Sequence, residues 1–186
     1  MIAGKFRSRP LHSLRGMDLR PTADRLRETL FNVLGAGNAT VFEGKVWLDL
    51  CAGTGAVGIE ALSRGAAQVY FVESSKAAAG LIERNLDSLG LEAGFEVLQE
   101  DVSRALRTLD TRKVVADFIF LDPPYRMEKV YVQVLQLLAQ SGLLAPDAAV
   151  VAEHDKRFDP GDGVAPLQRY RKLEQGDAVL SFYRQK

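Results

Sequence analysis

The tetrapeptide Asp122-Pro123-Pro124-Tyr125 stands at the end of the apolar run 117–122. Two consecutive prolines fix φ and remove two backbone donors, so the turn is stiff and presents carbonyl acceptors. The Asp122 carboxylate and the Pro123 carbonyl could hold both N–H bonds of an exocyclic amine and stabilise the positive charge that develops on its nitrogen. Tyr125 offers a π-face on which an extruded base could stack. The tetrapeptide predicts methyl transfer to a nucleobase amino group; a proline turn without a catalytic role is the alternative.

A glycine-rich loop follows the apolar run 46–51 and precedes a helix-like segment. Gly53, Gly55 and Gly58 form a G-x-G-x-x-G motif, in which the turn is tight and the backbone can approach a ligand closely. Dinucleotide dehydrogenases share this motif, and a loop without a nucleotide is a further alternative. Asp49, just before the loop, disfavours a pyrophosphate and suits a ligand with positive groups, such as the ammonium and sulfonium of S-adenosylmethionine. The loop predicts this methyl donor, with S-adenosylhomocysteine as the product.

Two further carboxylates end strand-like segments. Glu73 lies about 20 residues after the first loop glycine, where a carboxylate can accept both ribose hydroxyls. Asp101 could accept from an adenine amino group, cap the helix that follows, or do both. A solvated acid is the alternative for Glu73. The predicted donor-binding set is Asp49, Ala52, Gly53, Thr54, Gly55, Gly58, Glu73, Ser74, Asp101 and Val102.

The elements that would position these residues alternate between strand and helix patterns. Apolar, β-rich runs at 46–51, 68–73, 95–99, 117–122 and 148–153 alternate with helical periodicity at 56–64, 75–89, 102–109 and 128–140. This rhythm predicts an α/β fold with a mostly parallel, doubly wound sheet whose strands are covered on both faces. A helix is expected at 21–34, and an antiparallel hairpin at 169–174 and 178–184 closes the chain.

Charge is distributed unevenly although the net charge is zero. Residues 1–27 hold seven basic side chains and two acidic ones, and the rest of the chain is net acidic. A basic arm on an acidic body suits a phosphate backbone, whereas a solvated N-terminus is the alternative. We expect residues 1–20 to form a basic arm or hairpin that contacts RNA, and residues 21–186 to form the catalytic domain. The candidate RNA-binding residues are Lys5, Arg7, Arg9, Arg20 and Arg25.

Composition and residue spacing indicate the cellular compartment and bear on whether a metal is bound. The 186-residue chain shows no signal-peptide pattern and no apolar run long enough to cross a bilayer, and its single cysteine, Cys51, suits a reducing compartment. His12 and His154 lack metal-ligand spacing, so we expect no metal. These observations predict a cytoplasmic, metal-free monomer.

The whole pattern resembles the RsmD family of bacterial 16S rRNA guanine-N2 methyltransferases. The resemblance rests on the basic opening 2–9, the stretch 19–32, the loop segments 49–55 and 58–65, and the tetrapeptide at 122–125. It implies a class I, Rossmann-like methyltransferase fold with seven strands, S-adenosylmethionine as donor, and one guanine of 16S rRNA in the small ribosomal subunit as acceptor. It also implies that the arm helps to hold RNA. Cys51 stands where many class I enzymes have a glycine, and Tyr125 where family members often have phenylalanine.

Other classes of protein remain as rivals. A DNA or RNA adenine-N6 methyltransferase shares the tetrapeptide, but the DNA enzymes should carry a target-recognition domain, which we do not expect within this length. A protein-glutamine methyltransferase usually has a motif that begins with Asn. A non-catalytic RNA-binding factor is disfavoured by the intact Asp122 and glycine loop. A nicotinamide oxidoreductase is disfavoured by Asp49 and the Pro-Pro turn.

Overall fold

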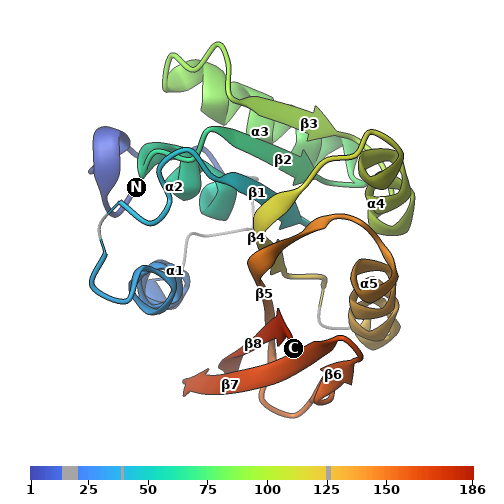
Figure 1. The fold of residues 1–186 in the computed structure, drawn as a ribbon. Helices are drawn as coiled ribbons and strands as arrows, with labels where there is room; N and C mark the ends of the chain where they lie inside the picture. The colour runs from blue at the N-terminus through green and yellow to red at the C-terminus, as the bar shows by residue number, and fades with distance from the viewer. Residues whose placement is uncertain (14–20, 39, 125–126) are drawn as a thin grey trace.

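A single mixed sheet organises the chain (Figure 1). The computed structural model describes residues 1–13, 21–38, 40–124 and 127–186, without the side chains of residues 21–23. Within these residues the sheet has the strand order β3-β2-β1-β4-β5-β8-β7-β6. The parallel strands are β1 (Val46–Leu50), β2 (Gln68–Val72), β3 (Phe95–Leu98), β4 (Ala116–Leu121) and β5 (Leu144–Asp155). The antiparallel end consists of β6 (Gly163–Val164), β7 (Leu167–Gln175) and β8 (Ala178–Gln185).

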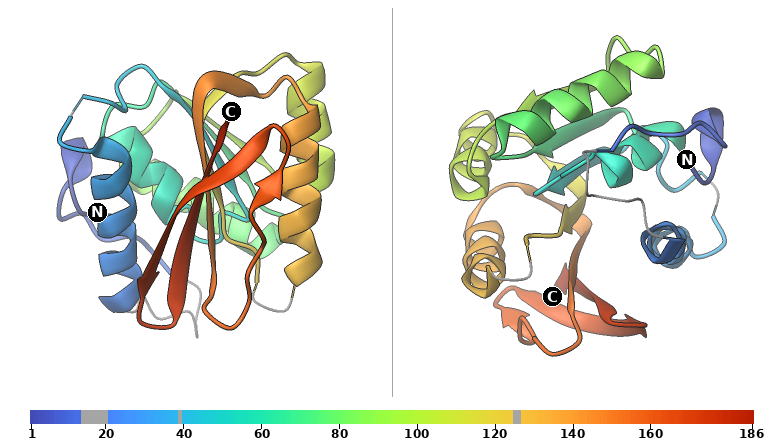
Figure 2. Two further views of the ribbon diagram at one scale, coloured as in Figure 1. Left: turned by 60° about the horizontal axis from the view of Figure 1, so that its bottom comes forward. Right: turned by 180° about the vertical axis from the view of Figure 1, so that it is seen from behind.

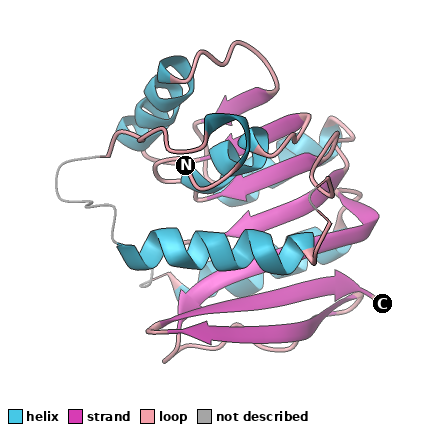
Figure 3. Cartoon of the chain, turned by 90° about the vertical axis from the view of Figure 1, so that its left-hand side faces the viewer, coloured by secondary structure: helices cyan, strands magenta, loops and turns pink. Residues whose placement is uncertain are grey.

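Helices cover both faces of the sheet. One face packs against α1 (Pro21–Gly35), α2 (Ala56–Ser63) and α3 (Lys76–Ser88), and the other against α4 (Val102–Thr111) and α5 (Glu128–Gln140). The left view of Figure 2 shows the sheet between α1 and the α4–α5 pair, and Figure 3 shows α1 in front of the strands. Among the described residues, no helix is long and apolar enough to span a bilayer.

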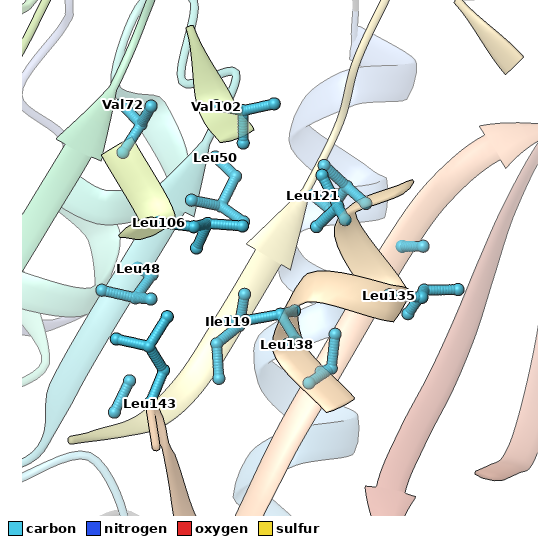
Figure 4. Packing of buried hydrophobic residues seen from close by; sticks show 14 of the residues in the cluster. Leu48, Leu50, Val72, Val102, Leu106, Ile119, Leu121, Leu135, Leu138 and Leu143 are labelled. Carbon is cyan, nitrogen blue, oxygen red and sulfur yellow. The ribbon is translucent and has the colours of Figure 1, made fainter. Parts of the chain in front are cut away.

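Alternation along β4 divides the core into two layers. Ile119 and Leu121 pack toward α5, where they meet Leu135 and Leu138 (Figure 4). Phe118 and Phe120 point to the opposite face, into the layer of α1–α3. Each fully buried large aliphatic side chain contributes roughly 1.5–3 kcal/mol relative to an exposed one. Both faces of this strand are therefore fixed, and its carboxyl end is held firmly in place.

The expected α/β fold is confirmed, with differences at the ends of the chain. The sheet gains an eighth strand, β6, which has only two residues and begins at Gly163 with φ of 111°. A strand this short carries no periodicity that the sequence could reveal. The N-terminal segment, expected as an arm or hairpin, has no strand within residues 1–13. It forms the short 3-10 helix η1 (Gly4–Phe6), because the amide of Arg7 bonds to the Gly4 carbonyl.

The order of the strands determines where a ligand can bind. From β1 the chain passes outward to β2 and β3, then returns to the other side of β1 with β4 and β5. In open α/β sheets, ligands bind beyond the carboxyl ends of the strands at such a reversal. The glycine loop follows β1 and the tetrapeptide follows β4, so both predicted motifs lie at the point of reversal.

Candidate active site

A cavity of about 530 Å³ opens at the carboxyl ends of β1–β4. Its lining joins the glycine loop, the ends of β2 and β3, the start of α5 and the tetrapeptide. The lining residues are Cys51, Gly53, Val72, Glu73, Ser74, Ser75, Ala78, Glu100, Asp101, Val102, Asp122, Pro123, Pro124, Met127 and Val130. The volume is within the range of about 300–1,000 Å³ that small-molecule sites occupy.

The glycine loop is shaped by left-handed backbone conformations. Gly53 and Gly55 have φ of 55° and 76°, and Cys51 has φ of 62°. A side chain at such a φ is strained, which explains why a glycine is common at the position of Cys51 in similar loops. Gly58 has another requirement, since a Cβ there would lie 2.3 Å from the Phe71 ring. The missing side chain lets α2 pack closely against β2.

Asp49 lies beneath this loop. Its side chain is 2% exposed, and one carboxylate oxygen accepts the Gly58 N–H at 2.8 Å. Burial raises its pKa to about 7 despite that hydrogen bond, with further contributions from the charges of Asp122 and Glu73. The side chain is not part of the cavity lining. Asp49 thus braces the first turn of α2, and its predicted pairing with a positively charged ligand group remains a prediction.

The carboxylates at the ends of β2 and β3 do line the cavity. One Glu73 oxygen accepts the Gly53 N–H at 2.9 Å and the other accepts the Ser75 N–H at 2.8 Å. Each carboxylate oxygen has a second lone pair, so hydroxyl groups of a ligand can still be accepted. Asp101 caps α4 by accepting the Ser103 N–H at 2.9 Å, and its other oxygen has no partner in the described chain. The helix-cap and ligand-binding interpretations of Asp101 are thus compatible.

The tetrapeptide closes the cavity on the β4 side. The Asp122 amide donates to the Leu50 carbonyl, and the Pro124 carbonyl accepts the Met127 N–H at 2.8 Å. The Pro123 carbonyl accepts no backbone hydrogen bond from the described residues. Burial raises the pKa of the half-buried Asp122 carboxyl to about 7. Asp122 and Pro123 thus present free acceptors at one end of the cavity.

The predicted site residues fall into three groups. The cavity contains Gly53, Glu73, Ser74, Asp101, Val102, Asp122, Pro123 and Pro124. The predicted residues in and around the glycine loop that do not line the cavity are Asp49, Ala52, Thr54, Gly55 and Gly58. Tyr125 and Arg20 lie outside the described residues. The lining residues that sequence reasoning missed are Cys51, Val72, Ser75, Ala78, Glu100, Met127 and Val130.

Most of the missed residues belong to no motif and reach the cavity through the tertiary packing of the chain. Ser75 could have been found, because it directly follows Glu73 and Ser74 and caps α3. Met127 and Val130 are three residues apart on either side of the start of α5, so they share one side of its first turn. No sequence signal shows that this side faces the cavity.

The first residues of the chain dock on α2 and α3. The fully buried Glu60 carboxylate accepts the N–H groups of Ile2 and Ala3, both at 2.9 Å. Ser63 accepts the Phe6 N–H at 2.9 Å, and the buried Asn85 side chain accepts the His12 N–H at 2.7 Å. Residues 1–13 are therefore fixed to the body of the domain by polar side chains.

The predicted RNA-binding side chains are exposed where the structure describes them. Lys5, Arg7 and Arg9 lie on the docked N-terminal segment, and Arg25 lies on α1. The Arg9 guanidinium donates to the Ser88 carbonyl at 2.8 Å, while no acidic side chain of the described chain forms an ion pair with these four residues. Their positive charge is available to a phosphate backbone.

Metal-ligating side chains do not gather within the described ranges. No three His, Cys, Asp or Glu residues there are close enough to hold a metal ion. The expectation of a metal-free site stays a prediction.

Known proteins resemble the chain over nearly its whole length. The family model described as "Conserved hypothetical protein 95" matches residues 1–184. A Bacillus subtilis protein named "Putative rRNA methyltransferase YlbH" is 35% identical over 186 residues, which cover 100% of this chain and 98% of the relative. The "Ribosomal RNA small subunit methyltransferase D" of Escherichia coli K12 is 36% identical over 155 residues, 83% of this chain and 74% of the relative.

A solved structure is similar to this chain in fold over the whole length of the chain. The structure titled "Putative methyltransferase yhhF from Escherichia coli" has a TM-score of 0.81 and 30% sequence identity, and the match covers 100% of this chain and 97% of that one. The similarity therefore extends through the docked N-terminal segment, the glycine loop and the C-terminal hairpin together.

Proposed function

The chain belongs to the RsmD-like family whose model is described as "Conserved hypothetical protein 95", and from this premise we propose that it methylates the N2 amino group of a guanine in 16S rRNA. S-adenosylmethionine would be the methyl donor, and the small ribosomal subunit, assembled or assembling in the cytoplasm, would present the guanine. The observation that carries the proposal is the cavity, in which the glycine loop and the Asp122-Pro123-Pro124 turn face one ligand site.

The lining suits the proposed donor. Polar acceptors stand at Glu73 and Asp101, where ribose and adenine groups could bind, and the apolar residues Val72, Ala78 and Val102 also line the cavity. The Asp122 end of the cavity is where a reacting methyl group would have to point. A sulfonium supplies an electrophilic methyl group when S-adenosylmethionine is bound.

The tetrapeptide would act on the acceptor amine. Asp122 accepts one N–H of the amino group and the Pro123 carbonyl accepts the other, which turns the nitrogen lone pair toward the methyl group. As the C–N bond forms, the bond between sulfur and the methyl carbon would break and S-adenosylhomocysteine would leave. Positive charge then develops on nitrogen, and the nearby carboxylate stabilises it. The proton leaves the nitrogen after transfer, and Asp122 can receive it. Stacking of the base on Tyr125 completes the proposed arrangement.

The exposed basic residues suit a large RNA partner. Lys5, Arg7 and Arg9 are held on α2 and α3 by the docked N-terminal segment, so their charges are preorganised. Each phosphate that they neutralise releases counterions and adds to affinity without reading sequence. We therefore propose that residues 1–20 form an RNA-contacting arm on a catalytic domain of residues 21–186.

Methyl transfer with labelled S-adenosylmethionine tests the proposal directly. The substrates are small subunits from cells that lack this enzyme, naked 16S rRNA and duplex DNA, and nucleoside mass spectrometry identifies the product. We expect N2-methylguanosine from an RNA substrate and no product from DNA. N6-methyladenosine as the product, or label in DNA alone, would replace the proposal with the adenine-N6 alternative.

A further inference from the structure

A second carboxylate stands beside Asp122 on the neighbouring strand. In the pairing of β4 with β5, Phe120 is the partner of Val151 and Leu121 is the partner of Ala152. Asp122 and Glu153 follow these pairs, and adjacent strands lie about 4.8 Å apart. Phe120 and Val151 pack in the same core layer, so alternation directs the side chains two positions later to that same side.

At this separation the charge of one carboxylate acts on the other. Burial and the Asp122 charge together raise the pKa of Glu153 well above its usual value. Glu153 is half-buried, and its main-chain carbonyl accepts the Tyr131 hydroxyl at 2.7 Å. The end of β5 is thereby anchored to α5, and the position of the Glu153 backbone is fixed.

Neither carboxylate has a hydrogen-bond donor within the described chain. By contrast, Asp49, Glu73 and Asp101 each accept at least one backbone N–H. Burying a hydrogen-bond acceptor costs free energy when no donor replaces the water that it loses. A bound ligand can supply that donor. Together, Asp122 and Glu153 favour a ligand that has several N–H groups along one edge.

The location of Glu153 points to the acceptor base and not to the methyl donor. The cavity spans the ends of β3, β2, β1 and β4, and Asp122 lies at its border. Glu153 is outside the lining, on β5, which follows β4 in the strand order. Figure 1 shows these two strands side by side. A base whose amino group reaches Asp122 would extend over the end of β5.

We propose that Glu153 is a specificity-determining residue that selects guanine by accepting its N1–H while Asp122 and Pro123 hold the adjacent N2 amino group. This inference rests on the proposed function. Guanine presents N1–H and the N2 amino group side by side. Glu153 would accept the N1–H, and Asp122 and Pro123 would accept the two N–H bonds of the amino group. Guanine N1–H favours the ionised form of Glu153 against the raised pKa of that carboxyl, whereas adenine presents an unprotonated N1 that would place a lone pair against the carboxylate. A site built to bond a substrate N–H rejects analogues that lack it far more strongly than an apolar pocket can.

A substrate with 2-aminopurine in place of the target guanine tests this inference. 2-Aminopurine keeps the amino group at position 2 but has an unprotonated N1. The RNA is 16S rRNA, and mass spectrometry of nuclease fragments of the methylated product locates the guanine that is replaced. We expect the wild-type protein to prefer guanine by roughly 10²-fold or more in kcat/KM. Because a glutamine amide can donate to the unprotonated N1, we expect Glu153→Gln to reduce that preference at least about 10-fold.

Controls separate this inference from the proposed function. Glu83→Gln makes the same chemical change on the exposed surface of α3 and should leave the preference unchanged. If Glu153→Gln transfers no methyl group, the relative affinity for the two RNAs is measured with S-adenosylhomocysteine present, using 2-aminopurine fluorescence and competition. An unchanged ratio in Glu153→Gln overturns the role of Glu153, even if guanine is methylated. If wild-type protein methylates no guanine, the proposed function itself fails.

Discussion

The buried Asp49 should make the protein less stable as pH rises, and Asp49→Asn should remove the part of the pH dependence that Asp49 contributes. Burial raises the pKa of Asp49 from 3.8 to about 7. The folded state therefore keeps a proton that the unfolded state loses between these values. Since stability falls with pH wherever the folded state binds more protons, the loss begins near pH 4 and is complete just above pH 7. At about 1.4 kcal/mol per pKa unit, the whole effect is on the order of 4 kcal/mol.

The variant should gain most at alkaline pH. Asparagine can still accept the Gly58 N–H through its amide oxygen, but it carries no charge. Any cost of burying its amide is the same at every pH, so it cancels when two pH values are compared. Between pH 5 and pH 8, linkage predicts that the stability of Asp49→Asn relative to wild type rises by about 2–3 kcal/mol.

Urea unfolding at pH 5 and pH 8 measures this difference. Asp87→Asn is the matched control, because Asp87 is exposed on α3, and such surface changes usually stay within about 0.5 kcal/mol. A stability difference between Asp49→Asn and wild type that is equal at both pH values would refute the reasoning. The same substitution should weaken S-adenosylmethionine binding more than S-adenosylhomocysteine binding, since only the former carries a sulfonium charge near the loop.

Three further predictions concern the tetrapeptide, the helix packing and the N-terminal segment. Asp122→Ala should abolish methyl transfer and leave S-adenosylmethionine binding nearly intact. In the wild-type protein the rate of methyl transfer should increase from pH 6 to pH 8. The pKa of Asp122 is about 7, so its carboxyl group becomes an ionised acceptor in that range. Gly58→Ala should lower the free energy of unfolding by about 1–3 kcal/mol because the new methyl group meets β2. Gly80→Ala, where the new methyl group would meet only the end of the Arg84 side chain at 3.5 Å, should raise it by about 0.5–1 kcal/mol. Neutral substitutions at Arg7 and Arg9 should weaken RNA binding and lower its log–log salt slope by about 0.7–0.9 for each lost phosphate contact.

Each of these predictions has an outcome that contradicts it. Transfer by Asp122→Ala, measured with labelled donor, would remove the carboxylate from the reaction. Equal urea midpoints for the two glycine variants would show that α2 can move away from β2. An unchanged salt slope, measured by RNA titration at several ionic strengths, would mean that the N-terminal segment does not touch phosphate.

Much of the fold could be predicted because its signals are local. The helix expected at 128–140 is α5 without change, and the other parallel strands and crossover helices end within a few residues of their predicted limits. The largest error is β5, which begins at Leu144 and not at residue 148. Pro146 and the exposed Asp147 interrupt the apolar pattern there, yet the backbone stays extended. Leu144 still pairs with Ala116 of β4, and the register of the two strands shifts between Ala116 and Phe118. Tertiary pairing overrides local preference at such positions.

The docking of the N-terminal segment could not be predicted, because its partners look like ordinary helix residues. Glu60 has the spacing of a surface glutamate, with Arg64 one turn later. In the folded chain it is fully buried and accepts two backbone N–H groups from the N-terminus. Nothing in the sequence links residues 2 and 60, and the contact exists only because η1 packs on α2.

The carboxylates along the sheet edge show most clearly where sequence reasoning stops. Asp49 lies one residue before the end of β1, and Glu73, Asp101 and Asp122 follow β2, β3 and β4, so the sequence favours ligand binding equally for all four. The structure separates them by their backbone donors, which depend on how each loop turns after its strand. After β1 and β2 the chain turns back, so backbone N–H groups satisfy both carboxylates: Gly58 of α2 donates to Asp49, and Gly53 and Ser75 donate to Glu73. After β4 the prolines supply no N–H, and no described residue donates to the Asp122 carboxylate, which leaves it available to a substrate amine. The Pro-Pro pair therefore has two effects, because it stiffens the turn and contributes no donor to the carboxylate beside it.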